Sequence, residues 1–307
     1  MERRHVTGVA PPAGVHAAAR RSKMSAMTAS TDPPASTRFA IDTAVTPLGD
    51  GRYRGRMDPS WWIIAGPNGG YVAAVLLRAV IAEVDDPARR PRSLTLHYLR
   101  PPVEGEVDVE VVVERSGRTV TNVSARMHQD GRTLVLALVA LASDRDEVIA
   151  FDETPGLPTL DDGAAVPPPT DVPVTEVDPD RDVPMRQHYD LRWVLGDLPF
   201  RPGEGARRAR TGGWLRPAEP EPVDEVVLVA MADAWMPPIF CRVEQPLAVP
   251  TIDLTVHFRA RPADPLDHCF VEFDSPVARD GYLVEHGRIL GADGRLLAES
   301  RQLAVVA

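Results

Sequence analysis

The chain has 307 residues, of which 44% are hydrophobic and 25% charged, a composition typical of a folded globular protein. Its formal net charge of −10 argues against nucleic-acid binding, and no basic stretch with interleaved aromatic residues offsets that charge. Two cysteines are too few for a disulfide framework and no His/Cys group has metal-ligand spacing, so we expect no metal site and a reducing, cytoplasmic location.

The first 36 residues are rich in Arg, Ala, Ser and Pro and show no periodic apolar pattern. They lack the continuous apolar segment of a signal peptide, and their prolines disfavour one long amphipathic helix. We therefore expect residues 1–36 to lie outside the fold, either as a disordered tail or as a segment upstream of a true start at Met24 or Met27. The longest apolar run, residues 133–142, is too short to span a bilayer, so it predicts a buried strand and no membrane partner.

The first half of the fold contains an apolar helix that follows a glycine-rich turn. A strand is expected at 50–57, and the helix at 68–82 begins with Asn68, Gly69 and Gly70. Glycines let another segment or a ligand approach the backbone, and a helix start exposes unpaired N–H groups. Four more strands are predicted in this half, at 92–99, 106–115, 119–128 and 132–143.

Residues 153–185 are rich in Pro and Asp and predict a linker between two units, 37–152 and 186–307. The second unit has its own apolar helix at about 223–236, with acidic residues at its start and Pro237-Pro238 at its end. Its predicted strands lie at 187–196, 206–216, 251–259, 268–275, 283–290 and 295–306.

The two units repeat each other. "LTLHYLRPP" (94–102) matches "LTVHFRARP" (254–262), and "DGRTLVLALVAL" (130–141) matches "DGRLLAESRQLAVV" (293–306), with an Asp-Gly hairpin turn in each. The separations are nearly equal, 254 − 94 = 160 residues and 293 − 130 = 163 residues. A long helix with a long antiparallel sheet in each unit predicts an α+β double hotdog, with the two sheets joined edge to edge so that edge strands are hidden.

The order and spacing of these pieces resemble the acyl-CoA thioesterase II family, the double-hotdog thioesterases, over about 37–307 apart from the linker. The pieces are the Gly-Gly helix start, an Asp in the second helix, "PTIDLTVHFR" (250–259) and "DGRLLAESRQ" (293–302). The resemblance implies hydrolysis of fatty acyl-CoA thioesters in fatty acid metabolism, with acyl-CoA as the partner and no cofactor. Carried over by motif, the catalytic residues are Asp233, Thr251 and Gln302.

The residues themselves agree with that implication. Asp233 lies in an apolar stretch, where an unpaired charge is costly, so a carboxylate there needs partners or a purpose. Thr251 and Gln302 could orient it and a water molecule, and the water would attack the thioester carbonyl. We expect Gly69, Gly70 and Asn68 to bind substrate and supply N–H donors for the oxyanion. Three arginines at matched strand ends are candidates for the CoA phosphates: Arg100, Arg259 and Arg261.

Two departures from the family pattern affect the site: Leu254 replaces a common His, and Ala232 a common Ser.

One alternative function is an enoyl-thioester hydratase or dehydratase, because His97 and His257 occupy matched positions. Another is a non-catalytic acyl-CoA-binding module, and a homo-oligomer is open in every case. No G-x-S-x-G elbow, Walker A loop or G-x-G-x-x-G loop is present, which disfavours serine-hydrolase and nucleotide-dependent chemistry. Acyl chain length and the choice between CoA and a carrier protein stay undecided.

Overall fold

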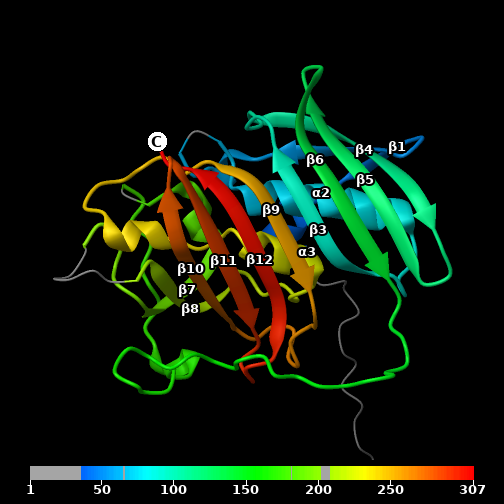
Figure 1. The fold of residues 1–307 in the computed structure, drawn as a ribbon. Helices are drawn as coiled ribbons and strands as arrows, with labels where there is room; N and C mark the ends of the chain where they lie inside the picture. The colour runs from blue at the N-terminus through cyan, green and yellow to red at the C-terminus, as the bar shows by residue number, and fades with distance from the viewer. Residues whose placement is uncertain (1–35, 65, 181, 202–207) are drawn as a thin grey trace, which may run out of the picture. The chain divides into compact units, whose positions relative to one another are not determined.

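A twelve-stranded antiparallel sheet organises the chain (Figure 1). The computed structural model describes residues 36–307 except 65, 181 and 202–207, and the tail expected at 1–36 lies outside the described residues but for residue 36. The first half of the sheet has the order β1 (Thr46–Gly49), β2 (Arg52–Met57), β4 (Gly105–Ser116), β5 (Val120–Gln129), β6 (Arg132–Ala142), β3 (Arg90–Tyr98). The second continues with β9 (Thr251–Phe258), β12 (Leu296–Val305), β11 (Tyr282–Leu290), β10 (Cys269–Arg279), β8 (Arg210–Pro217), β7 (Tyr189–Leu195).

The two halves of the sheet meet at β3 and β9. These strands pair antiparallel, with Ser93 opposite His257 and His97 opposite Asp253. Because the pairing is antiparallel, the end of β3 lies beside the start of β9. The predicted double hotdog with sheets joined edge to edge is confirmed, and residues 36–307 form a single compact unit.

Two helices, α2 (Gly69–Val84) and α3 (Glu225–Met231), pack against each other on one face of the sheet (Figure 1). The close packing requires a glycine, since a Cβ on Gly70 would lie 2.4 Å from the Ala230 carbonyl oxygen. The short helices are α1 (Arg38–Asp42), η1 (Pro59–Trp61), η2 (Pro169–Asp171), η3 (Pro184–His188) and η4 (Pro238–Arg242). Among the described residues, no helix combines the length and apolar character needed to cross a membrane.

The structure corrects the predicted end of the second helix and bears out the predicted turns. Helix α3 ends at Met231 instead of 236, so Asp233 lies in the turn after the helix and not inside it. The two Asp-Gly turns lie where they were predicted: Asp130-Gly131 joins β5 and β6, with both residues at positive φ, and Asp293-Gly294 lies in the loop at 291–295 that joins the antiparallel strands β11 and β12. A further two-residue Asp-Gly turn, at 280–281, joins β10 and β11.

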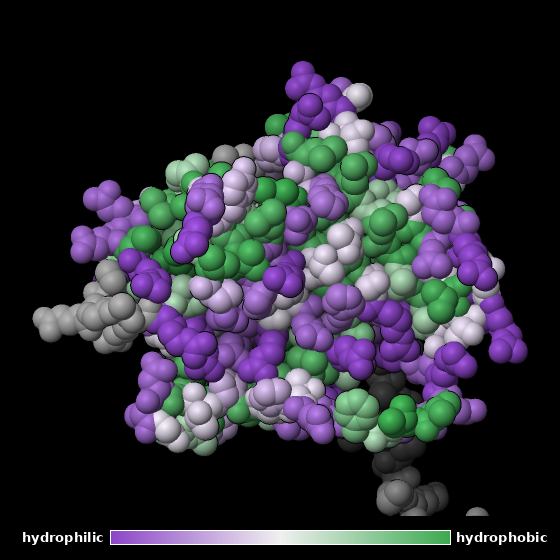
Figure 2. Space-filling model, viewed as in Figure 1, coloured by the Kyte–Doolittle hydropathy of each residue, from purple (hydrophilic) through white to green (hydrophobic). Residues whose placement is uncertain are grey.

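The predicted linker packs on the second half of the sheet, on the face turned away from the helices. The Trp214 indole N–H donates to the Pro167 carbonyl at 2.8 Å, and Val172 packs in a cluster with Trp214 and Phe270. The first half has exposed apolar side chains on its strands, among them Leu136 and Leu138. Figure 2 shows hydrophobic and hydrophilic side chains interspersed over the face toward the viewer.

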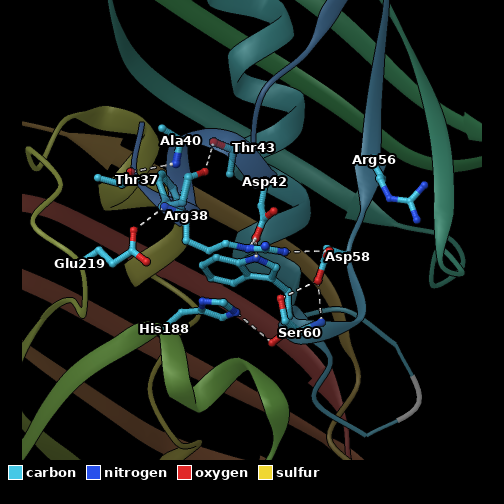
Figure 3. Close-up of polar contacts among 12 residues, drawn as sticks. Thr37, Arg38, Ala40, Asp42, Thr43, Arg56, Asp58, Ser60, His188 and Glu219 are labelled. Atoms are coloured by element: carbon cyan, nitrogen blue, oxygen red, sulfur yellow. Dashed lines mark hydrogen bonds and ion pairs between the residues drawn. The ribbon is translucent and has the colours of Figure 1, made fainter. Parts of the chain in front are cut away.

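A polar cluster fastens α1 to both halves of the chain (Figure 3). The Arg38 guanidinium pairs with Asp42 at 2.6 Å and with Asp58 at 2.9 Å, and the Arg38 backbone N–H donates to Glu219 at 2.6 Å. His188 stacks on the buried Trp61 ring, with 3.9 Å between centroids, and its Nε2 lies 3.1 Å from the Ser60 carbonyl oxygen. These contacts connect segments more than 100 residues apart in sequence.

Candidate active site

Asp233 lies where the turn after α3 meets the start of α2. Its Oδ2 accepts the Gly70 backbone N–H at 3.0 Å and the Asn68 side-chain amide at 3.0 Å, and the same amide donates to the Asp233 carbonyl at 2.6 Å. Asn68 also caps α2, because its Oδ1 accepts the Tyr71 backbone N–H at 3.0 Å. A carboxylate from the second repeat therefore sits on a helix start of the first.

The surroundings of Asp233 raise the pKa of its carboxyl group. Burial of this group raises its pKa from 3.8 to about 6, although hydrogen bonds from Gly70, Gln302, Gly69 and Asn68 act to lower it. The residue as a whole keeps some exposed surface, while the carboxyl group lies among protein atoms. A pKa near 6 leaves the group ionised at neutral pH yet basic enough to accept a proton.

Gln302 and Thr251 complete the group of side chains around Asp233. Thr251 Oγ1 donates to Gln302 Oε1 at 3.0 Å, and Gln302 Nε2 lies 3.4 Å from the Ala232 carbonyl oxygen. Gln302 is buried on β12, and Thr251 begins β9. The structure thus brings together the three residues that the sequence singled out for catalysis.

The glycines of the helix start contact Asp233 in a way the sequence did not predict. We expected the N–H groups of Gly69 and Gly70 to be free for an oxyanion, but both act on the Asp233 carboxylate. A Cβ at Gly69 would lie 2.9 Å from Asp233 Oδ2 and 3.2 Å from the Tyr98 ring. In this structure the helix start stabilises the negative charge of Asp233, which fits the positive end of a helix dipole.

The three candidate phosphate-binding arginines do not come together. Arg100 follows the end of β3, beside the start of β9 and Thr251, and is exposed. Arg259 and Arg261 follow the far end of β9, about 26 Å along the strand from Thr251 at 3.3 Å per residue. Arg261 also forms an ion pair at 2.6 Å with the buried Glu225.

The matched histidines lie away from Asp233. His97 and His257 are exposed, while their strand neighbours Leu96 and Val256 are buried against the helices. Since side chains alternate along a strand, both imidazoles point to the opposite face of the sheet from Asp233. Neither of these two histidines therefore lies beside the Asp233 carboxylate, as the chemistry of a hydratase would require.

Three further residues near Asp233 were not predicted. Glu285 lies opposite Gln302 in the pairing of β11 with β12, and Gln302 Nε2 donates to Glu285 Oε1 at 3.3 Å. Tyr98 donates to the Gly69 carbonyl at 2.9 Å, and Asp233 together with burial raises the pKa of both Tyr98 and Tyr189. The signal for Glu285 was available: it is an acid at an inward position of an alternating strand, between Leu283 and Gly287.

Comparison with protein families gives two matches that together span most of the chain. Residues 58–143 match the acyl-CoA thioesterase N-terminal domain, and residues 166–306 match the acyl-CoA thioesterase C-terminal domain. Over the described residues, no group of three or more His, Cys, Asp or Glu side chains is arranged to hold a metal ion.

Solved structures and curated sequences provide further relatives. A conserved hot dog protein of unknown function from Alicyclobacillus acidocaldarius is 27% identical, with a TM-score of 0.76, 89% of this chain and 99% of that one covered. A putative thioesterase II from Thermobifida fusca is 28% identical, with a TM-score of 0.73, covering 88% and 98%. An uncharacterized protein of Mycobacterium tuberculosis is 26% identical over 83% of this chain and 90% of its own length.

Proposed function

This chain belongs to the acyl-CoA thioesterase family and is a thioester hydrolase, and from that premise we propose that Asp233 activates the water molecule that attacks the thioester carbonyl. The observation that carries the proposal is the group formed by Asp233 at the α2 start with Gln302 and Thr251. We call residues 68–70 the α2 start and residues 224–226 the α3 start.

In the proposed reaction Asp233 acts as a general base. The Asp233 carboxylate accepts a proton from a water molecule, whose oxygen then bonds to the thioester carbon. The tetrahedral intermediate expels CoA as a thiolate when the carbon–sulfur bond breaks, and the proton held by Asp233 passes to the sulfur. The products are a free acid and CoA, and Asp233 is again ionised. Thr251 fixes the orientation of the Gln302 amide by donating to its oxygen.

Features beside the α2 start suit an acyl-CoA substrate. Ile63 and Ile64, in the segment just before it, are 41% and 77% exposed, and Leu99, after β3, is 48% exposed. Exposed apolar side chains of this kind offer contacts to an acyl chain. Arg100 lies at the same end of β3 and is the candidate for a CoA phosphate.

Free-thiol release from acyl-CoAs of two to sixteen carbons tests the proposal, with wild type and Asp233→Asn measured side by side. We expect release that depends on chain length and is lost in Asp233→Asn. His257→Asn is the matched control, because its side chain lies on the opposite face of the sheet and should leave release unchanged.

Three other outcomes would contradict parts of the proposal. Acyl-CoA binding without thiol release would indicate a binding module. Loss of activity in His257→Asn, with hydration of an enoyl-CoA by wild type, would indicate a hydratase. Release that survives in Asp233→Asn would keep the reaction and overturn the assignment of the general base.

A further inference from the structure

Glu285 lies directly against the proposed catalytic group. It faces Gln302 across β11 and β12, and its strand neighbours of the same parity, Leu283 and Gly287, are buried toward the helices. The Gln302 amide nitrogen, 3.3 Å from Glu285 Oε1, also interacts with Asp233. One amide therefore connects two carboxyl groups.

The surroundings of Glu285 favour its neutral form. Burial raises the pKa of Glu285 well above 4.5, and the carboxylates of Asp233 and Asp274 raise it further. Asp233 comes from the turn after α3, Asp274 from β10 and Gln302 from β12. The next residue on β11, His286, lies opposite Asp274 in the register of β10 and β11. None of these neighbours supplies a positive charge within hydrogen-bonding distance of Glu285 in the described structure.

The two carboxyl groups are not equivalent. Asp233 accepts hydrogen bonds from N–H groups of the α2 start, which stabilise its negative charge. Glu285 accepts a hydrogen bond from the Gln302 amide, which also interacts with Asp233. When two acids that contact the same amide share one negative charge, the charge goes to the one with more donors. The proton of the pair therefore resides on Glu285 while Asp233 is ionised.

We propose that Glu285 is a positioning residue of the hydrolysis site. As a neutral acid it holds the Gln302 amide in the orientation needed for catalysis, and it adds no second negative charge near the thioester. This inference rests on the proposed function. It predicts a bell-shaped pH dependence, in which activity rises as Asp233 loses its proton and falls as Glu285 loses its own. The fall follows because a second carboxylate would oppose the oxyanion that forms during attack.

Three variants test the positioning role by their kcat, KM and pH profile. Glu285→Gln keeps the shape and neutrality of the protonated acid, so we expect a kcat within about threefold of wild type at pH 7 and no decline at alkaline pH. Glu285→Leu removes the partner of Gln302, so kcat should fall about tenfold with little change in KM. Glu299→Gln is the control, since Glu299 is an exposed acid on β12.

Carbon-13 NMR of protein labelled at the glutamate side-chain carboxyl gives a readout that does not depend on activity. We expect one resonance to titrate well above the others and to disappear in Glu285→Gln. Titration of every glutamate near the ordinary value would overturn the proposal, and so would wild-type kcat and pH profile in Glu285→Leu. If wild type releases no thiol, the proposed function and the role of Glu285 in it both fail, whereas the NMR result still decides where the proton lies.

Discussion

The α2 start and the α3 start occupy corresponding places in the two repeats and have different chemistry. Each begins with a polar N-cap residue, Asn68 or Asp224. At the α3 start, Asp224 itself accepts the N–H groups of the next two helical residues, Val226 and Val227, at 2.9 and 3.0 Å. At the α2 start, the Gly70 N–H is instead taken by Asp233, a residue 163 positions away in the other repeat.

The first helical residue accounts for much of this difference. Because Gly69 has no side chain, the Asp233 carboxylate and the Tyr98 ring can lie close to its backbone, where a Cβ atom would be too near both of them. Glu225 fills the corresponding place in the second repeat, is 4% exposed, and pairs with Arg261 at 2.6 Å and with Arg90 at 3.6 Å. In the proposed mechanism the α2 start is therefore the reactive one, whereas in the described structure an ion-pair cluster closes the α3 start.

The largest effect is expected from exchanging acid for amide at the two starts. Asp233→Asn should reduce kcat for thiol release by about a thousandfold, because general-base catalysis contributes roughly 10²–10⁴ in rate. Glu225→Gln should leave kcat within about twofold, since the proposed mechanism gives Glu225, which pairs with Arg261, no role in the reaction. Steady-state rates on one acyl-CoA check both, and equal losses in the two variants would refute the assignment of a single reactive start.

The ion-pair cluster at the α3 start should govern stability. Arg261→Met leaves the buried Glu225 carboxylate without its closest partner. Because Arg261 itself is half-exposed and Arg90 still faces Glu225, the cost lies between those of an exposed and a buried ion pair, about 2 kcal/mol. Urea unfolding would measure this loss, with kcat at neutral pH expected to be unchanged. Arg259→Met is the matched control because Arg259 is exposed like Arg261 but forms no ion pair in the described part of the chain, and it should change the free energy of unfolding by less than about 0.5 kcal/mol. Equal stability of the two variants would show that the cluster contributes nothing.

The two glycines of the α2 start should separate packing from chemistry. A methyl group at Gly70 would meet the Ala230 carbonyl oxygen, which is backbone, so Gly70→Ala should lower the free energy of unfolding by about 2 kcal/mol. At Gly69 the methyl group would meet the Asp233 carboxylate, whose side chain can move, so Gly69→Ala should mainly lower kcat. Thermal unfolding and thiol release compare them. Gly156→Ala is the control, because its nearest contact would be 3.9 Å away.

Sequence patterns predicted those helices and strands well whose limits are marked by the residues of the segment itself. Apolar alternation predicted the strands, the repeat predicted how the sheets join, and the family resemblance selected Asp233, Thr251 and Gln302. The end of α3 was misplaced because the residues after Met231 stay apolar: Ala232, Ala234 and Trp235 are all buried without being helical. Burial continued past the helix, so the pattern could not mark its end.

The contacts between repeats could not be predicted in the same way. Which N–H groups face Asp233 depends on how α2 and α3 pack, and no local pattern encodes a contact over 163 residues. Because β3 and β9 pair antiparallel, Arg100 and Arg259 lie at opposite ends of these two strands, although each follows the matched strand of its repeat in the sequence. The position of Glu285 beside Gln302 depends on strand register, which the sequence left open.

The smallest expected effect is the pH dependence of stability that the α2 start creates. Because the pKa of Asp233 is raised to about 6 in the folded protein, the native state binds more protons than the unfolded state between about pH 4 and 6. Stability contributed by this group is therefore full below pH 4 and is lost as pH rises through 6. Allowing for the partial exposure of Asp233, the loss amounts to about 1–2 kcal/mol.

Urea unfolding of wild type and Asp233→Asn at pH 4.5 and pH 7.5 measures this effect. Wild type should lose stability relative to the variant as the pH rises. A wild type that gains stability relative to Asp233→Asn over the same interval would mean that the N–H groups of the α2 start outweigh burial. In that case Asp233 would be an ordinary capped carboxylate, and the contrast between the two helix starts would be one of structure and not of reactivity.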